Sequence, residues 1–136
     1  VKFARAATIG VKAYFSNKIY DPNASDCAKV YSVARAIQKT SAVARAALEE
    51  LLVRVKPEEE QAGFFTSIPK GVMIQSLTIS DGILRVDFSE ALEFQVGGSC
   101  RVTAIRSQIR ETGKQFPSIR DVVISINGRT EDILQP

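Results

Sequence analysis

The chain has 136 residues and a formal net charge of +3, and 45% of its residues are hydrophobic and 24% are charged. This size and composition are typical of one globular domain and exclude collagen-like and wholly disordered chains. Histidine is absent from the sequence, which excludes Ser-His-Asp and Cys-His catalytic sites and removes the commonest metal ligand.

The N-terminal part of the chain is predicted to form an arm and two strands. Residues 1–10 show no hydrophobic period and are interpreted as a linker or N-terminal arm, so the single predicted domain covers residues 11–136. Residues 11–16 and 30–37 are predicted strands, because their apolar side chains partly alternate. The polar residues between these strands indicate a loop.

The clearest helix is predicted over residues 41–55. Thr40 or Ser41 is its expected N-cap, and the helix ends before Pro57. The acidic run at 58–60 is interpreted as solvated surface. Apolar residues at helical spacing form one stripe of the helix, which consists of Val43, Ala47, Leu48, Leu51, Leu52 and Val55.

The middle of the chain is predicted to form a β-hairpin. Residues 72–79 and 83–88 are apolar and flank the dipeptide Asp81-Gly82, which is a strong signal for a two-residue turn. Alternation in the second strand predicts that one face is buried, with Leu84, Val86 and Phe88 pointing inward.

The C-terminal part is predicted to form a second helix and a last strand. The helix covers residues 99–114, with Ser99 as its N-cap, and the strand covers residues 121–127. Asn127-Gly128 then predicts a turn, and the tail is interpreted as a short extended cover. The apolar stripe of the helix consists of Val102, Ile105, Ile109, Thr112 and Phe116.

The order of elements predicts an α+β fold. The economical arrangement is a two-layer sandwich, with two helices on one face of a small mixed or antiparallel sheet. We predict that the inward residues of all these elements share one core, which contains Leu48, Leu51, Leu84, Val86, Ile105, Ile109, Ile124 and Ile126.

Candidate catalytic and binding residues are few. Cys100 and Arg106 have the C-x5-R spacing of phosphatase loops, but Val102 and Ile105 between them belong to the helix stripe, so we interpret Cys100 as a helix start. Basic residues are scattered along the chain, which argues against nucleic-acid binding. We expect no catalytic residue, no cofactor and no metal.

The two cysteines allow two interpretations. Cys27 follows a polar loop and Cys100 begins a predicted helix. They are either two buried, inert thiols or a disulfide formed in an oxidising compartment, and the residues alone favour neither.

Four segments of the sequence resemble the GerMN domain family, which comprises domains of sporulation and spore-germination proteins and of bacterial envelope lipoproteins. The resemblance covers residues 11–136, and its most specific parts are the hairpin and the motif GGSCRVTAIR. The segments are TSAVARAALEELL at 40–52, GFFTSIPKGVMIQSLTISDGILRVDFSEAL at 63–92, GGSCRVTAIRSQI at 97–109 and FPSIRDVVISINGRTEDILQP at 116–136.

The resemblance implies a fold similar to the ring-building motif of sporulation and secretion assemblies, in which two helices on a three-stranded sheet pack between subunits. It implies an extracytoplasmic location, with a membrane anchor in an upstream segment that is not in this chain. Because family members often have cysteine at the positions of Cys27 and Cys100, it also implies a disulfide between them. The family provides no catalytic residue.

Our first functional hypothesis is a non-catalytic interaction or assembly domain of a cell-envelope protein. Its partners are envelope proteins or copies of itself, and the isolated domain is expected to be monomeric or weakly associating. The expected contact surface is the exposed side of the second helix, with Arg101, Arg106 and Arg110.

Two alternatives remain open. The chain is an envelope ligand-binding module, for example for peptidoglycan, that uses Phe64 and Phe65 or the Gly97-Gly98 turn. One of the two adjacent phenylalanines is expected to pack inward, while the other is exposed or covers a sheet edge. The third hypothesis is a thiol-dependent enzyme at Cys100, which needs a free thiol.

Overall fold

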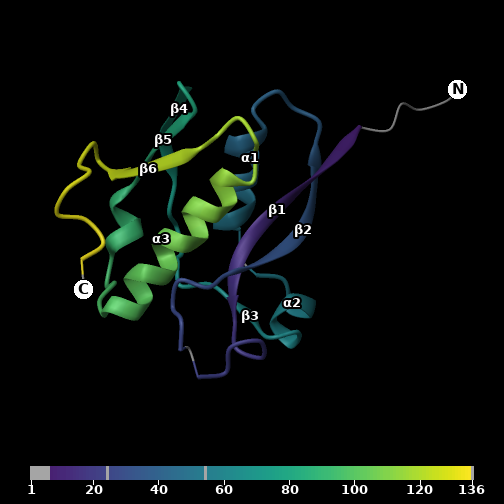
Figure 1. Ribbon diagram of the computed structural model, residues 1–136, viewed down its shortest axis with the longest axis vertical. Coiled ribbons are helices and arrows are strands. Elements are labelled where there is room, and N and C mark those ends of the chain that lie inside the picture. The colour runs from purple at the N-terminus through teal and green to yellow at the C-terminus, as the bar shows by residue number, and fades with distance from the viewer. Residues whose placement is uncertain (1–6, 24, 54, 136) are drawn as a thin grey trace, which may run out of the picture.

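A computed structural model describes residues 7–23, 25–53 and 55–135 (Figure 1). The α+β class is confirmed, and each predicted helix and strand forms. In chain order the elements are β1 (Thr8–Asn17), β2 (Tyr31–Gln38), α1 (Val43–Leu52), α2 (Pro57–Gln61), β3 (Phe64–Phe65), β4 (Ile74–Ser80), β5 (Ile83–Phe88), the 3-10 turn η1 (Glu90–Glu93), α3 (Ser99–Lys114) and β6 (Asp121–Ile126).

The strands divide into two three-stranded sheets. One sheet has the order β2-β1-β3 and is antiparallel, and the other has the order β4-β5-β6, in which β5 and β6 are parallel. The second edge of β1 is only partly paired with a strand, because β3 covers only Ser16 and Asn17. Farther along this edge, the N–H groups of Lys12 and Tyr14 donate to the side chains of Gln115 and Thr112 at the C-terminal end of α3.

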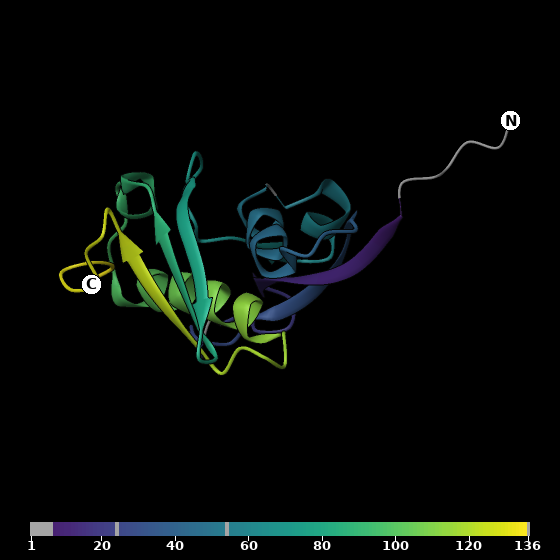
Figure 2. The ribbon, with the colours of Figure 1, turned by 90° about the horizontal axis from the view of Figure 1, so that it is seen from above.

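The two long helices lie on one side of the mixed sheet β4-β5-β6 and are covered on the other side by β1. Both α1 and α3 contact β1, and α3 also contacts β6 (Figure 2). The segment α1-β4-β5-α3-β6 is therefore the predicted sandwich of two helices on a small mixed sheet. The β1-β2 hairpin is an additional layer.

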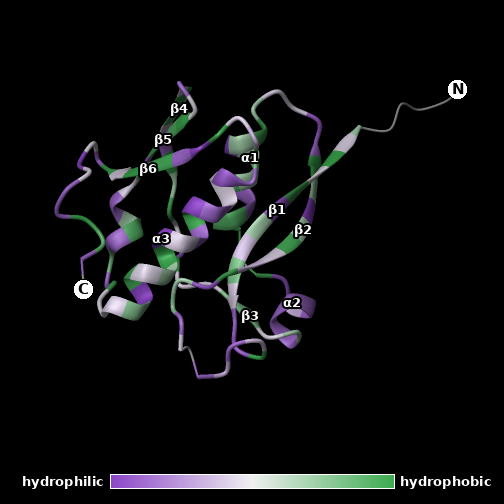
Figure 3. Cartoon of the chain, in the orientation of Figure 1, coloured by the Kyte–Doolittle hydropathy of each residue, from purple (hydrophilic) through white to green (hydrophobic). Residues whose placement is uncertain are grey.

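One continuous core joins all these layers, and it contains each of the eight core residues predicted from the sequence. Phe15 of β1 and Phe88 of β5 are fully buried in it. The C-terminal tail closes the core with Ile133 and Leu134, as the predicted cover. Figure 3 shows the alternation of hydrophobic and hydrophilic residues along α3, whose apolar stripe faces this core.

The turns follow the sequence signals. Asp81 and Gly82 both have positive φ, at 54° and 78°, as do Asn127 and Gly128, at 49° and 79°. Two consecutive residues with positive φ define the type I′ turn that matches the twist of a hairpin. The hairpin prediction is thus confirmed in its detail.

The helix ends and the N-terminal arm differ from prediction. Gly98, with a φ of 88°, and Ala42 hold the N-cap positions, and neither helix has a side-chain cap. Helix α1 begins one residue later than a Ser41 cap requires, and α3 begins at Ser99 itself, one residue earlier than a Ser99 cap requires. Strand β1 extends back to Thr8 by pairing with Gln38, so part of the predicted arm is strand. Residues 1–6 of that arm lie outside the described residues.

The acidic run at 58–60 forms α2, which is hydrophilic along its length (Figure 3). The prediction that the run is solvated surface is wrong for Glu59. Its carboxylate binds the buried guanidinium of Arg35 on β2 and, together with Glu50, supplies the counter-charge of that guanidinium.

Candidate functional site

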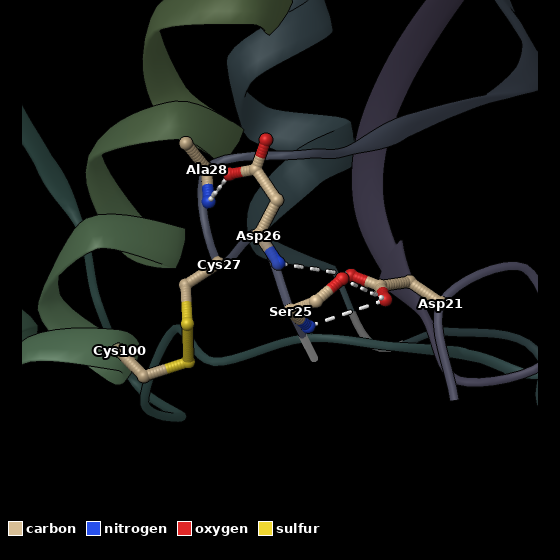
Figure 4. The surroundings of a disulfide bond; sticks show 6 residues. All are labelled: Asp21, Ser25, Asp26, Cys27, Ala28 and Cys100. Carbon is tan, nitrogen blue, oxygen red and sulfur yellow. Dashed lines mark hydrogen bonds between the residues drawn. A yellow bond between two sulfur atoms is a disulfide. The ribbon is translucent and has the colours of Figure 1, made fainter. Parts of the chain in front are cut away.

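A disulfide joins Cys27, in the loop between β1 and β2, to Cys100 in the first turn of α3 (Figure 4). The two Cα atoms are 5.2 Å apart, within the usual range for a disulfide. Cys100 is exposed and Cys27 is half-buried. In this state Cys100 has no thiol to act as a nucleophile.

The loop before Cys27 is organised by the carboxylate of Asp21. The backbone N–H groups of Ser25 and Asp26 donate to it, at 3.3 and 3.4 Å, and so does the hydroxyl of Ser25, at 3.1 Å (Figure 4). Desolvation acts to raise the pKa of Asp21, but these hydrogen bonds and Lys29 together hold it below its ordinary value. Asp21 is therefore a loop-fixing anion that is already satisfied.

The two adjacent phenylalanines of β3 have different surroundings. Phe64 is half-buried and meets the ring of Tyr20 edge-on at 6.0 Å, whereas Phe65 is 42% exposed. Behind Phe65, the buried amide of Gln108 on α3 donates to the Thr66 hydroxyl at 2.9 Å and accepts from the Ser67 N–H at 3.0 Å. These bonds tie the residues that follow Phe65 to α3.

Two hollows meet at Phe65. The disulfide hollow, of about 350 Å³, is bordered by the disulfide, Asp21, Asp26 and Lys29. The second hollow, of about 380 Å³, is bordered by apolar and by charged side chains, which are Leu51, Leu52, Val53, Val55, Ile68 and Pro69 and the charged Glu60, Lys70 and Arg101. Phe65 and Arg101 line both hollows, so the two adjoin at these residues, and together they are the candidate site, called the groove below.

The three arginines of the expected contact surface reach three different segments of their own chain. Arg101 donates to the backbone oxygens of Ser67 and Gln95, and Arg106 donates to that of Ile133. Arg110 donates to the Val122 oxygen and forms an ion pair with Asp121. Beyond its first turn, the exposed residues of α3 are instead Thr103, Glu111 and Lys114.

Sequence reasoning singled out Phe65, Cys27, Cys100 and Arg101, and the structure brings these four together at the groove. It does not bring in Gly97 and Gly98, which form the turn into α3 and line neither hollow. Gln108 was missed. Its signal was its position on the apolar stripe of α3, where a polar side chain needs a partner in the interior.

The profile of the Germane family, described as "Sporulation and spore germination", matches residues 12–132. The chain belongs to the Germane family. The GerMN resemblance inferred from the sequence is thereby confirmed. No curated protein matches the chain significantly.

Solved structures similar to this Germane domain include two from Bacillus subtilis. The tandem GerMN domains of the sporulation protein GerM superpose with a TM-score of 0.69 at 25% identity, over 90% of this chain and 40% of that one. The first GerMN domain of GerM superposes with a TM-score of 0.63 at 25% identity, over 89% of this chain and 84% of that one. The chain thus spans 40% of the tandem structure.

A third similar structure is that of a candidate lipoprotein from Clostridium perfringens. It superposes with a TM-score of 0.54 at 17% identity, over 94% of this chain and 82% of that one. At this identity the match shows only that the two proteins share the Germane fold.

Within the described part of this Germane domain, no group of three or more acidic or cysteine side chains is arranged to hold a metal ion. Among the same residues, no helix is both long and apolar enough to cross a membrane. The groove at Phe65 combines an exposed aromatic ring with both acidic and basic side chains, namely Asp21, Asp26, Glu60, Lys29, Lys70 and Arg101.

Proposed function

We propose that this Germane domain is a non-catalytic assembly module of a bacterial cell-envelope protein. It contacts envelope proteins or other copies of itself, and it is anchored through a segment outside this chain. The observation that carries the proposal is the segment α1-β4-β5-α3-β6, two helices on a mixed three-stranded sheet, shared with the GerMN domains of a sporulation protein. This is the layer arrangement through which ring-building motifs pack side by side.

The disulfide supports the extracytoplasmic part of the proposal. Disulfides persist in oxidising compartments and are rare where thiols are kept reduced. The bond between Cys27 and Cys100 is also at the surface, where a cytosolic reductant would reach it.

Two exposed faces are available for assembly. The β1-β2 hairpin covers part of both helices, so the free surfaces are the α3 stripe of Thr103, Glu111 and Lys114 and the outer face of the mixed sheet, around Thr78 and Arg85. The exposed residues named here are polar or charged on both faces. Such contacts are weak in solution, and tethering to one membrane raises the effective concentration enough to form them.

A density-dependent association experiment tests this proposal. The domain is attached to lipid vesicles through a terminal tag, and energy transfer between labelled copies is followed against surface density. For the wild type, we expect more energy transfer than random crowding of the labelled copies would give at the same surface density. For Thr103→Arg, we expect energy transfer to fall to the level of random crowding. Gln38→Arg makes the same charge change at an exposed residue of β2 and serves as the control. Wild-type transfer equal to random crowding would refute assembly between copies.

The non-catalytic part of the proposal has its own test. Phosphatase and muramidase assays on the oxidised and reduced protein are expected to show no turnover above buffer. Turnover that appears on reduction and disappears in Cys100→Ser would establish the thiol-dependent enzyme instead.

The groove at Phe65 favours a second candidate function, an envelope ligand-binding module, for example for peptidoglycan. An exposed aromatic ring beside apolar side chains is typical of ligand sites. Co-sedimentation with purified peptidoglycan tests this candidate, with Phe65→Ala expected to weaken binding. Phe94→Ala is the matched control, because Phe94 is 65% exposed and lies outside both hollows.

A further inference from the structure

Strand β4 forms one edge of the mixed sheet, on the side turned toward α1 (Figure 2). Ser80 and Ile83 flank the two-residue turn and form a hydrogen-bonded pair, and such pairs alternate with non-bonded ones along an antiparallel ladder. Leu77 and Ile79 of β4 therefore direct their N–H and C=O groups away from β5. Within the described residues no further strand pairs with β4 and no other hydrogen bond reaches these groups, so this edge is open.

The opposite edge of the same sheet is occupied by its own chain. On β6, Arg110 donates to the Val122 carbonyl at 3.0 Å, and Ile126 and Arg129 exchange main-chain hydrogen bonds at 2.9 and 3.0 Å. Strand β4 contains neither a charged residue nor proline, which are two common means of keeping an edge strand from pairing with another chain. Its bulge affects only residues 74–76. The rest of β4 is thus a regular strand whose edge is free to pair.

Two further hollows lie beside this open edge, and we call them the edge hollows. One, of about 370 Å³, is bordered by Leu77 and Ile79 of β4 and by the start of α1. The other, of about 310 Å³, is bordered by Ile74 at the beginning of β4 and by later residues of α1. Arg45 of α1 lines both of them. A strand added beside β4 would therefore lie over both edge hollows.

The lining of the edge hollows is mainly apolar, and its charges are paired with each other. The charged residues of the lining are Arg45 and Glu49, which form an ion pair at 3.2 Å. The other polar residues of the lining are Ser41 and Ser118. Three large hydrophobic residues that border the edge hollows are about half exposed or more, namely Val53, Met73 and Ile79. Exposed apolar side chains that gather in this way are typical of an interaction surface.

The spacing of the two edge hollows fits a single strand. Ile74 and Ile79 line one hollow each, and their partners across the ladder are Phe88 and Leu84 of β5. These partners are four residues apart, because the bulge adds one residue to β4. On a regular strand, residues four apart point to the same side of the sheet. A strand on the free edge of β4 thus presents two such side chains, at i and i+4, to the two hollows.

We propose that the free edge of β4 binds an extended strand of another protein, which continues the mixed sheet as its fourth strand. The main chain of this partner pairs with Leu77 and Ile79, and its side chains at i and i+4 enter the edge hollows. The partner segment is uncharged where it pairs and apolar at alternate positions, because β4 carries no charge and the charges that line the hollows are paired with each other. This edge is distinct from the two assembly faces described above, so the inference goes beyond the proposed function.

The test uses probes that differ only in where their main chain is blocked. A peptide with the sequence Thr-Val-Thr-Val-Thr-Val-Thr, followed by a Gly-Lys-Lys tail that carries fluorescein, is titrated with the domain. Two isomers of it carry two N-methyl groups each, one on the first two valines and the other on the second and third threonines. The N–H groups of successive residues point to opposite edges of a strand, so only one isomer directs its methyl groups at β4.

We expect the unmethylated peptide to bind, and one isomer to bind at least about tenfold more weakly than the other, because its methyl groups replace the donors that face β4. With the valines in the edge hollows, loss of binding in the valine isomer indicates an antiparallel partner strand, and loss in the threonine isomer indicates a parallel one. Equal affinities of the two isomers, or no saturable binding of the unmethylated peptide up to about 1 mM domain, would overturn the proposal.

Variants of the domain assign the binding to β4. Ile79→Lys places a charge at the free edge and is expected to weaken binding of the unmethylated peptide at least about tenfold. Ile19→Lys is the matched control, because Ile19 is also exposed but lies outside both edge hollows, and its affinity should stay within about twofold of the wild type. Unchanged affinity in Ile79→Lys, or an equal loss in Ile19→Lys, would contradict the assignment. The comparison of isomers on the wild type stands even if a variant fails to fold.

Analytical ultracentrifugation of the domain without peptide tests whether the occupant of the edge is another protein. We expect a monomer at the domain concentrations of the titration, which leaves the edge of β4 available to a different chain. A dimer that Ile79→Lys dissociates would mean that a second copy occupies the edge, and it would overturn the assignment to another protein.

Discussion

The carboxylate of Glu59 accepts two hydrogen bonds from the guanidinium of Arg35, at 2.7 and 3.2 Å, and the Arg35 side chain is only 1% exposed. Glu50 of α1 lies 3.3 Å from the same guanidinium, and the ring of Phe15 lies 5.5 Å from it. Because α2 buries no residue of its own, this ion pair adds a charged link to the contacts between α2 and β3 of the first sheet.

Glu59→Gln is expected to destabilise the domain by about 3 kcal/mol. The substitution removes the closer of the two carboxylates that neutralise the buried Arg35 guanidinium and leaves only the longer ion pair with Glu50. Urea unfolding monitored by circular dichroism measures the loss. Glu58→Gln changes the exposed neighbour and is expected to stay within about 0.5 kcal/mol of wild type. If both variants unfold at the same urea concentration, the pair contributes nothing beyond surface charge.

The disulfide closes a separation of 73 residues. On the loop-entropy model its removal costs roughly 4 kcal/mol. We expect the double variant Cys27→Ser, Cys100→Ser to fold with a midpoint lowered accordingly, because its core does not include the disulfide. Reductant should lower the wild-type midpoint to that of the double variant and leave the variant itself unchanged. If reductant leaves the unfolding midpoint of the wild type unchanged, the disulfide does not form in solution.

Much of the fold could be predicted because local rules decide it. Asp81-Gly82 sets the hairpin, and the apolar stripe from Val102 to Thr112 sets the helix that joins both sheets. The third strand of the first sheet could not be predicted, since β3 has only two residues and its pairing with Ser16 and Asn17 is a tertiary contact. A strand of two residues is too short to show a periodic pattern of hydrophobic side chains.

The groove was predictable in its members but not in its geometry. Phe64 and Phe65 are adjacent residues of the same type, so the sequence does not distinguish them. The register of β3 against β1 decides which ring is exposed. The Arg35 pair had a signal that was overlooked. Arg35 lies between Val33 and Ile37 in the same alternating pattern, so all three side chains point to the buried face of β2. An arginine that points inward requires a carboxylate from elsewhere in the chain.

Asp87 on the outer face of the mixed sheet makes stability depend on pH. Its carboxylate accepts bonds from the Ser125 hydroxyl at 2.6 Å, the Gly128 N–H at 2.7 Å and the Gln75 amide at 2.7 Å. Desolvation acts to raise the pKa of Asp87, but these bonds lower it below its ordinary value overall. The stabilisation is therefore complete above the unfolded pKa of about 3.9 and is lost as pH falls through the lower folded value.

Asp87→Asn is expected to cost about 1 kcal/mol at neutral pH, because an exposed hydrogen-bond network contributes at the low end of the usual range. The difference from wild type should be constant between about pH 5 and pH 8 and should shrink below about pH 4. Thermal unfolding across this range measures it. Asp81→Asn, in the hairpin turn, serves as the control, and a difference that grows in acid would contradict the role of Asp87.

Gly113 on α3 sets the distance between this helix and β6. A Cβ atom at this position would lie 2.8 Å from Cγ2 of Val122, closer than real Cβ contacts allow, and Val122 is 2% exposed. Two effects therefore oppose each other in Gly113→Ala. The alanine gains about 1 kcal/mol of helix propensity, and the forced shift of a stiff, buried valine costs typically 1–3 kcal/mol.

We expect the steric cost to win, so that Gly113→Ala lowers the free energy of unfolding by about 1 kcal/mol. The double variant with Val122→Ala separates the two effects. If the contact is the cause, Gly113→Ala should stabilise the Val122→Ala background, because the space vacated by Cγ2 accepts the new methyl group and only the helix propensity remains. Equal effects of Gly113→Ala in both backgrounds would mean that the close approach of α3 and β6 does not require glycine. The sign of the change in the alanine background, measured by urea unfolding, therefore decides between packing and propensity at this helix.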